Sequence, residues 1–395
     1  MTSVGDVDLR LGGYVQVDAV PWAQDSIDEL EPSTRAPLNE QRLLVRRARV
    51  KVEARRGPLA AAVEVDGNTV DGARAGLVGA TVGYARARAG AGDTDEPLVA
   101  IAAGLLKAPF GAEVPASERD KPMLEPPAFA RALFPGNYDA GVAAHGAFGF
   151  ARWALGVVDG APVGDARWHG RDPLARVDVV ARLGAVIDGP ARSRFEAGVS
   201  ALTGRGLHPG DPPTKDGLQW IDENEDGIVQ TTELQVVPGT PGTPSEAYAH
   251  AALGADLRVS WCLCRLGPGT AFAEVAVATN LDRGLVYADP VEASRELRQL
   301  GFAVGAVQDV GAHAQVGVRY DRYDADRDAS EREGVELVGA APVFATWAVM
   351  AAARWGDARW LVQYDHERNP FGRGDDGRPA TLEADRVTVR AQVGF

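Results

Sequence analysis

The sequence predicts an all-β fold, a transmembrane antiparallel β-barrel of sixteen strands that residues 1–395 form as a single domain. Three observations lead to this prediction. The chain ends in an alternating apolar segment, similar segments recur along its whole length, and the connections between them are alternately long and short. No run of about 18 apolar residues, the length that a membrane-spanning helix needs, is present.

The C-terminal segment, residues 385–395, carries an apolar residue at every second position from Val387 to Phe395. Alternation of period two places these side chains on one face of a strand and Arg386 and Arg390 on the other. An exposed apolar strand at the end of a soluble chain invites aggregation, whereas a closed barrel in lipid has no free edge. The final Phe is typical of the last strand of bacterial outer-membrane proteins, which this segment resembles. We expect it to pair with the first strand near Leu9–Val17.

The remaining strands show the same alternation. Between residues 47 and 55, for example, small apolar residues interleave with charged ones. The candidate strands lie near residues 8–20, 43–55, 59–66, 77–87, 97–106, 138–146, 151–159, 174–186, 193–203, 247–262, 270–279, 297–308, 314–323, 343–354, 358–366 and 385–395.

The connections alternate in length, apart from a rather short one at 67–76 and a rather long one at 88–96. Bacterial porins show this parity, with short periplasmic turns, longer outer loops and an even number of strands. A sandwich or a propeller has no reason to alternate in this way. The long connections are near 21–42, 67–76, 107–137, 160–173, 204–246, 280–296, 324–342 and 367–384.

Composition excludes several other functions. The chain has 41 basic and 55 acidic residues and a net charge of −14, which argues against nucleic-acid binding. The six histidines form no catalytic pattern and no glycine-rich phosphate loop precedes a helix, so we expect no enzyme. The N-terminus lacks the basic and apolar regions of a signal peptide. We therefore expect the mature form of an outer-membrane protein of a Gram-negative-type bacterium.

Four basic residues in the second candidate strand share one face, because they lie at steps of two or four residues. Facing lipid at mid-bilayer would cost roughly 2–4 kcal/mol for each, so we expect them to point into a water-filled lumen and attract anions. The alternative is that lumen charges of both signs only keep an unselective channel wet. In the other strands, the basic residues that alternate with apolar ones are assigned to the lumen in the same way. The full set of predicted pore-lining, anion-attracting residues is Arg47, Arg49, Lys51, Arg55, Arg176, Arg182, Arg194 and Arg319.

The chain also resembles the phosphate-selective porin O and P family, through pieces that stand in the order of that family. This resemblance implies a sixteen-stranded trimeric porin whose third loop folds into the lumen. The chain differs from the family in its acidic balance and in a long insertion at 204–246. The matching pieces are residues 13–18, 46–53, 62–66, 104–111, 118–119, 135–142 with 145–146, 319–324 and the terminal strand.

The third long connection, residues 107–137, is rich in proline and charge. A loop of this length without secondary structure is usually functional, and the resemblance implies that it forms the constriction. The alternative is a solvated surface loop. Its candidate constriction residues are Lys107, Glu113, Glu118, Arg119, Lys121 and Arg131.

Within the long connection at 204–246, residues 222–233 match the EF-hand calcium loop, with Gly227 at the sharp turn. Flanking prolines make the usual flanking helices doubtful. A bound calcium ion would neutralise the carboxylates and order the loop, whereas the alternative is an acidic solvated loop that matches by chance. The predicted calcium ligands are Asp222, Asn224, Asp226, Ile228 (through its carbonyl), Gln230 and Glu233.

Cys262 and Cys264 would share one face of a strand, with Cα atoms about 6.6 Å apart. This separation is at the upper limit for a disulfide, so a disulfide, a metal site and two free thiols all remain open.

Together these observations predict an outer-membrane diffusion porin, embedded in lipid as a homotrimer, that passes small hydrophilic solutes. We expect a preference for anions, with phosphate among the candidates. One alternative is a plugged, calcium-stabilised barrel with a structural or adhesive role. Another is a soluble, secreted all-β protein.

Overall fold

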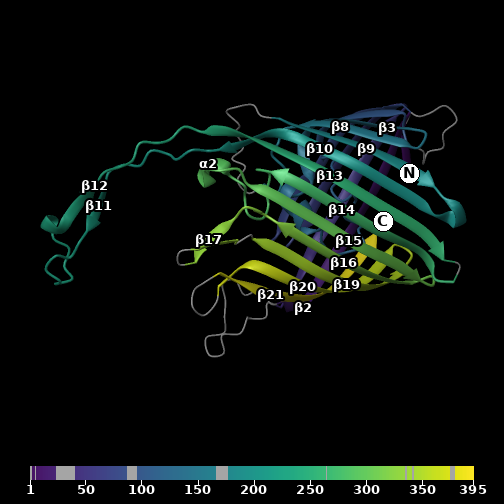
Figure 1. Cartoon of the computed structure of the whole chain (residues 1–395). Coiled ribbons are helices and arrows are strands. Elements are labelled where there is room, and N and C mark those ends of the chain that lie inside the picture. Colours follow the sequence, from purple (N-terminus) through teal and green to yellow (C-terminus); the bar gives the residue numbers. More distant parts are fainter. Residues whose placement is uncertain are drawn as a thin grey trace.

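The computed structural model describes residues 2–4, 6–23, 41–86, 96–165, 177–263, 265–333, 336–339, 342–373 and 379–395. Sixteen antiparallel strands pair into a closed barrel, and each of them overlaps one predicted strand. Figure 1 shows how these strands are arranged. The wall strands are β2 (Val7–Ala23), β3 (Arg42–Arg56), β4 (Leu59–Asn68), β5 (Arg74–Arg86), β6 (Val99–Lys107), β7 (Tyr138–Phe148), β8 (Ala151–Val158), β9 (Asp178–Asp188), β10 (Arg194–His208), β13 (Glu246–Leu263), β14 (Gly267–Thr279), β15 (Arg298–Val310), β16 (Ala314–Asp324), β19 (Val343–Trp355), β20 (Ala358–Arg373) and β21 (Pro379–Gly394).

The barrel closes where β21 pairs with β2. Their register runs from Tyr14, opposite Gly394, to Ala23, opposite Arg386. Next to this paired stretch, Gly13 and Phe395 exchange two backbone hydrogen bonds of 3.0 Å. The expected pairing near Leu9–Val17 is therefore wrong for its first part, and the true pairing continues further along β2. Glycine at position 13 suits this contact, because a Cβ there would lie 2.6 Å from the Phe395 ring.

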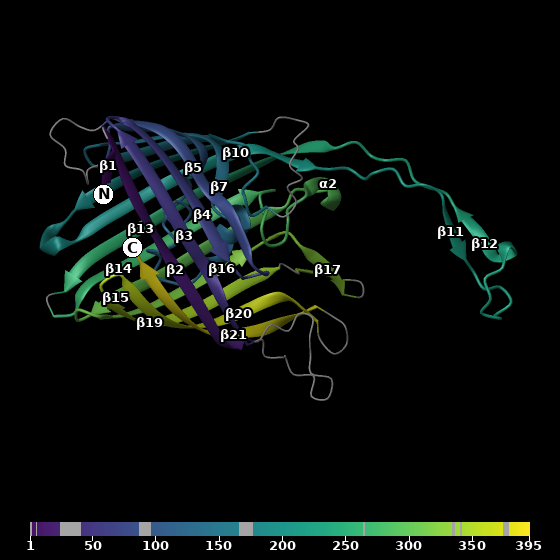
Figure 2. The same ribbon diagram turned by 180° about the vertical axis from the view of Figure 1, so that it is seen from behind.

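The two ends of the barrel differ. Both termini and the short turns lie at one end, which we call the turn end, and the long connections lie at the other, the loop end (Figures 1 and 2). Gly57 and Gly356 adopt positive φ angles in two of these turns, a conformation that favours glycine. Porins orient their short turns toward the periplasm. The predicted alternation of long and short connections thus assigns the connections to the correct ends of the barrel.

Residues 209–245 leave the loop end as a long arm (Figure 1). Near its tip, the strands β11 (Gly217–Trp220) and β12 (Leu234–Val237) form a hairpin. A second outer hairpin joins β17 (Ser330–Glu333) to β18 (Glu336–Gly339), and β1 (Thr2–Val4) pairs with the start of β2.

Helical structure is limited to short pieces. The helices α1 (Ala128–Leu133) and α2 (Pro290–Ala293) are accompanied by two single 3-10 turns among the described residues. No helix in the described part of the chain is long and apolar enough to cross a membrane.

The outer face of the wall is apolar. On β3, Val50 and Val52 are 39% and 48% exposed, while Arg47 and Arg49, earlier on the same strand, are buried on the inner face. Aromatic side chains are exposed at the turn end, as in the aromatic girdles of barrels that sit in lipid. These girdle residues are Phe148, Phe150, Trp355, Trp360 and Phe395.

Candidate functional site

Residues 108–137, which we call the inner loop, connect β6 to β7 and cross the lumen. The backbone NH of Gly111 donates to Ser200 Oγ of β10 at 3.0 Å. The NH of Leu124 donates to Gln363 Oε1 of β20 at 3.0 Å, and that of Ala128 to Asp321 Oδ1 of β16 at 3.0 Å. A loop that starts at β6 can reach all three strands only through the inside of the barrel.

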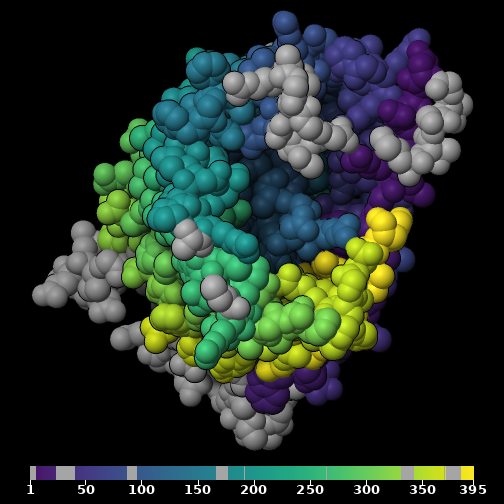
Figure 3. Space-filling model, turned by 90° about the vertical axis from the view of Figure 1, so that its right-hand side faces the viewer, coloured from purple at the N-terminus to yellow at the C-terminus, as the bar shows by residue number. Residues whose placement is uncertain are grey.

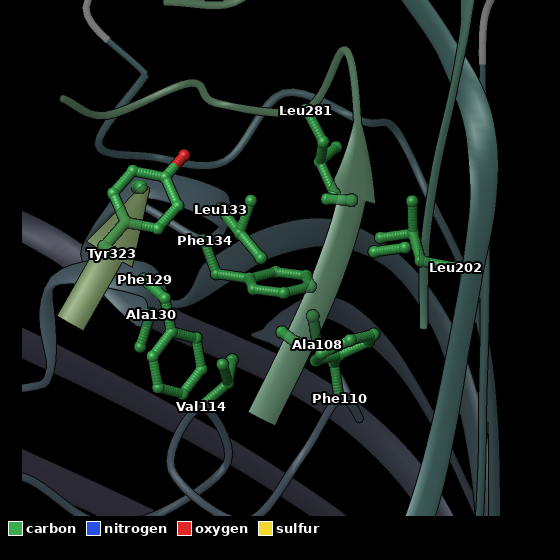
Figure 4. Packing of buried hydrophobic residues seen from close by; sticks show 14 of the residues in the cluster. Ala108, Phe110, Val114, Phe129, Ala130, Leu133, Phe134, Leu202, Leu281 and Tyr323 are labelled. Carbon is green, nitrogen blue, oxygen red and sulfur yellow. The ribbon is translucent and has the colours of Figure 1, made fainter. Parts of the chain in front are cut away.

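One side of the inner loop packs on an apolar part of the wall. Phe110, Phe129, Leu133 and Phe134 are each at most 3% exposed, and Figure 4 shows them gathered with Leu202 and Tyr323. The rings of Phe110 and Phe134 lie 4.9 Å apart. A smaller hydrophobic cluster joins Met123 and Leu124 to β15, β19 and β20, and the larger one lies inside the barrel, mainly on the strands from β8 to β19. Its wall residues are Val158, Val180, Leu202, Ala252, Ala276, Ala278, Ala303, Tyr323 and Phe344.

The other side of the inner loop is held by charges, with Glu125 at the centre. Its carboxylate lies 2.7 Å from Arg46, 3.6 Å from Arg47 and 3.2 Å from Arg390. Arg390 also contacts Asp18 at 2.6 Å. These partners come from β2, β3 and β21, so Glu125 ties the loop to the seam at which the barrel closes.

A second acidic residue of the inner loop, Glu118, completes this network. Its carboxylate lies 3.4 Å from Arg47 and 2.7 Å from Lys121, and Lys121 lies 3.0 Å from Glu113. We call Glu118 and Glu125, together with their cationic partners, the carboxylate latch.

Both latch carboxylates have lowered pKa values. Burial by itself would raise the pKa of Glu118, but the charges of Lys121 and Arg47 outweigh it and lower that pKa below its ordinary value. For Glu125, burial is again opposed, chiefly by Arg46 and Arg47, and the pKa lies well below its ordinary value. Both groups are therefore ionised at neutral pH.

The predicted pore-lining residues lie on the inner face of the wall, but each one that is described has a carboxylate partner. Arg49 lies 3.3 Å from Glu64, and both Lys51 and Arg55 contact Glu53, at 2.6 and 3.9 Å. Arg47 belongs to the latch. The remaining pairs are Arg182 with Asp256, Arg194 with Glu196 and Arg319 with Asp321, whereas Arg176 lies outside the described residues.

The predicted constriction residues lie in three places. Glu113, Glu118 and Lys121 are brought together, and Lys107 lies nearby, donating to the carbonyl of Ala116. Arg119 points toward the turn end, where it contacts Asp357 at 3.5 Å. Arg131, on α1, lines a cavity on the opposite side of the loop.

Cavities lie on both sides of the inner loop. A turn-end cavity of about 670 Å³ is bounded by β2 to β7 and by Pro115, Ser117, Glu118 and Arg119 of the loop. A smaller cavity of about 210 Å³ on the loop-end side, the arginine cavity, is bounded by Leu124, Glu125 and Arg131. Figure 3 shows the hollow of the turn end, with blue chain of the colour of the inner loop region inside it.

A third cavity, of about 610 Å³, lies among the outer loops. His208 contacts Asp289 at 2.8 Å, and Asp178 contacts both His250 at 2.7 Å and Arg283 at 3.0 Å. This outer cavity is acidic, in contrast with the arginine cavity. Its carboxylates are Asp165, Asp211, Asp282, Asp289 and Glu292.

The predicted calcium loop forms the tip of the arm, between β11 and β12 in place of helices. Asp222 accepts from the backbone NH groups of Asp226 and Gly227, at 3.1 and 2.8 Å. Asp226 accepts from Gln230, and Glu233 from Trp220 Nε1 at 2.9 Å. Throughout the described ranges, no three His, Cys, Asp or Glu side chains are grouped so that they could hold a metal ion. Calcium binding stays a prediction.

Cys262 lies on β13 and forms no disulfide with a described residue, and Cys264 lies outside the described residues, so the pairing of the two cysteines stays open.

Sequence reasoning missed Arg46, Glu125 and Arg390 as a connected group. Arg46 is out of phase with Arg47, but a β-bulge opposite Gln16 and Val17 inserts it into β3, so both arginines reach the latch. Nothing in an isolated sequence marks such a bulge. Glu125 and Arg390 are 265 positions apart, and only the closure of the barrel brings them together.

Comparison with known proteins supports the fold. No protein-family model and no curated protein matches the chain. Among solved structures, the outer-membrane channel DcaP of Acinetobacter baumannii superposes with a TM-score of 0.61 at 12% identity, covering 100% of this chain and 99% of that one. An anion-selective porin from Comamonas acidovorans gives 0.59 at 11% identity, with 98% and 100% covered. Pseudomonas putida OprB gives 0.56 at 10% identity, with 99% and 94% covered.

These likenesses and the geometry define the class of protein. The chain is a sixteen-stranded outer-membrane β-barrel with the fold of bacterial porins. The predicted fold class and outer-membrane location are confirmed. Membership of the phosphate-selective porin O and P family stays a prediction.

Proposed function

We propose that this protein is a passive diffusion porin for small hydrophilic solutes, with a preference for anions and with no catalytic step. The single observation that carries the proposal is a closed barrel with an apolar outer face and charged cavities on both sides of an in-folded loop. Such an interior offers hydrophilic solutes a water-filled path across the membrane, which the lipid itself does not.

The anion preference rests on an excess of cationic over acidic side chains in the lining of two cavities, although several of these cations also pair with carboxylates of the protein, as Arg386 does with Asp365 at 3.4 Å. The arginine cavity has five guanidinium groups against the carboxylates of Asp18 and Glu125. The turn-end cavity has five cationic and three acidic side chains, and Phe395, which bears the C-terminal carboxylate, also lines it. Excess positive charge in a confined space concentrates anions. Phosphate is one candidate, and the anion-selective Comamonas porin is a precedent for anion preference on this fold. The five guanidinium groups are those of Arg42, Arg46, Arg131, Arg386 and Arg390.

Planar-bilayer recording tests this proposal. Single channels under a potassium chloride gradient should reverse at a potential that shows chloride preference. Arg131→Gln should reduce the preference, whereas Arg194→Gln, which changes a paired residue at the turn end, should leave it nearly unchanged. Cation selectivity of the unmodified protein would contradict the anion preference. Competition by phosphate would identify it as a preferred solute.

The plugged-barrel alternative has one observation in its favour, which is the apolar cluster that fills part of the lumen. The same recordings decide between the two functions. A porin gives steady ohmic steps, and a plugged barrel gives none.

Two further parts of the proposal concern assembly and calcium. A homotrimer is expected from the family resemblance, and cross-linking in intact membranes should then yield a trimer band. The arm is expected to take up calcium at residues 222–233, where Asp222, Asn224 and Asp226 already accept hydrogen bonds around the turn at Gly227.

A further inference from the structure

The turn-end cavity has features of a binding site, in addition to its place in the proposed diffusion path. It lies between the inner faces of β2 to β7 and the turn-end side of the inner loop, and its volume of about 670 Å³ exceeds what a small solute needs. The cavity is open toward the turn end, where Figure 3 shows the hollow. A solute could therefore enter it directly.

Two buried polar groups line this cavity without a hydrogen-bond partner in the described part of the chain. They are the hydroxyl of Tyr14, which is 6% exposed, and Nε of Arg49, which is 9% exposed. Asp66 lies 3.6 Å from that Nε, beyond hydrogen-bond reach. Buried polar groups are normally paired, so an unpaired one calls for an explanation such as a bound ion or a water molecule.

The charge of the cavity favours an anion. Lys107 Nζ donates to the carbonyl of Ala116 and lies 5.4 Å from the centre of the Tyr138 ring. Within the described ranges, no carboxylate lies within ion-pair distance of Lys107. A dipole and a ring face therefore meet its charge at close range, and Glu118 and Glu64 act on it from beyond ion-pair distance. Arg49, in contrast, already has Glu64 as an ion-pair partner.

The walls also contain apolar surface that a bare inorganic anion would leave uncovered. The rings of Tyr14 and Tyr138 face the cavity together with Leu106 and Pro115. The arginine cavity differs, because it is smaller and richer in guanidinium groups. The two cavities thus suit anions of different kinds.

We propose that the turn-end cavity binds small organic carboxylates that carry an apolar body. The carboxylate would lie against Lys107, the Arg49 Nε and the Tyr14 hydroxyl, and the body against the tyrosine rings. This inference rests on the proposed function for access through the channel, but the site itself can be tested without transport.

The experiment uses the full-length protein in detergent micelles and in planar bilayers, with benzoate as the probe and acetate as the small comparison anion. Calorimetry on micelles should show saturable benzoate binding, at least tenfold tighter than acetate. In bilayers, benzoate should reduce the chloride current in a saturable manner.

Three variants locate the site. Tyr14→Phe removes only the hydroxyl and should weaken benzoate about tenfold or more, the loss expected for one hydrogen bond to a charged acceptor. Lys107→Gln should weaken it at least tenfold. Arg131→Gln, in the arginine cavity, is the matched control and should leave benzoate affinity unchanged.

The outcomes separate the two proposals. Anion-selective conductance without saturable benzoate binding would overturn the proposed carboxylate site and leave the proposed porin function standing. Benzoate binding without conductance would overturn the porin and leave the site. Equal affinity for benzoate and acetate, or an unchanged affinity in Tyr14→Phe and Lys107→Gln, would also overturn the site. Thermal melting of each variant confirms that it is folded.

Discussion

The two sides of the inner loop are held by different forces. Toward β8–β19, the loop buries Phe110, Phe129 and Leu133 in an apolar cluster. Toward β2, β3 and β21, it is held by the carboxylate latch of Glu118 and Glu125. Burial of apolar groups depends little on pH or on charge, whereas ion pairs depend on both. One side therefore anchors the loop, and the other can respond to conditions.

The difference also bears on selectivity. The latch uses Arg46, Arg47 and Arg390 to bind carboxylates of the protein itself. These arginines are thus less available to a passing anion than a simple count of lumen charges suggests. Changing the latch should change selectivity, and changing the apolar side should change the position and stability of the loop.

The largest expected effect is on the apolar side. Phe129→Ala removes a ring that is 1% exposed and packs against Gly301, so it should lower the free energy of unfolding by about 3–5 kcal/mol. Urea unfolding in detergent measures this loss. Phe148→Ala, on the exposed outer face at the turn end, is the matched control in micelles. A loss below about 1 kcal/mol for Phe129→Ala would show that the cluster does not anchor the loop.

Glu125→Gln should have the next largest effect. It keeps the size of the side chain but leaves Arg46, Arg47 and Arg390 without their shared carboxylate. We expect a loss of about 1–3 kcal/mol and a stronger anion preference in reversal potentials. Glu53→Gln, whose carboxylate lies outside the latch, controls for the loss of one lumen charge. An equal shift in both variants would rule out a special role for the latch.

Acid should weaken the latch side only. Because the pKa values of Glu118 and Glu125 are lowered from their ordinary value of 4.5, the stabilisation they supply is complete above about pH 4.5 and is lost as the pH falls through their values in the folded protein. Protease sensitivity of the inner loop and open-channel noise should therefore both rise as the pH is lowered from 4.5. In Glu118→Gln/Glu125→Gln, this acid response should be absent. Its persistence there would assign it to other groups.

The smallest effect on the barrel is expected from calcium, because its predicted site is on the arm, far from both sides of the loop (Figure 1). Trp220 donates to Glu233, so terbium bound in place of calcium should show luminescence sensitised by Trp220. Asp222→Asn/Asp226→Asn should abolish the signal, with Asp216→Asn as the control. Chelation should change cleavage of residues 209–245 and leave the melting temperature of the barrel unchanged. An unchanged cleavage pattern would count against an ordering role.

Much of the fold follows from local pattern. The sixteen wall strands, their two faces and the sorting of connections between the two ends depend on alternation and on turn length, which are properties of neighbouring residues. Arg47, Arg49, Lys51 and Arg55 share one face of β3, because side-chain direction alternates along a strand; that they line the pore and attract anions stays a prediction.

The candidate site was predictable only in part. Glu118 and Arg119 were singled out, but not the partners of their carbonyl groups, since Gln16 and Gln392 lie on strands far away in sequence. The apolar filling of the lumen was not expected either. The alternating apolar residues identify the faces of a strand, but both faces of β9 and β10 carry apolar residues, such as Val179 beside Val180 and Ala201 beside Leu202.

The sequence alone determined that this chain forms an outer-membrane β-barrel, because the period of its apolar residues and the lengths of its turns are local. Closure of the barrel determined the rest. It brought Arg46, by a bulge, and Arg390, by the pairing of the last strand with the first, to one carboxylate on a loop from β6. Distances across a lumen depend on strand number, register and loop packing together, and no segment of the chain contains that information.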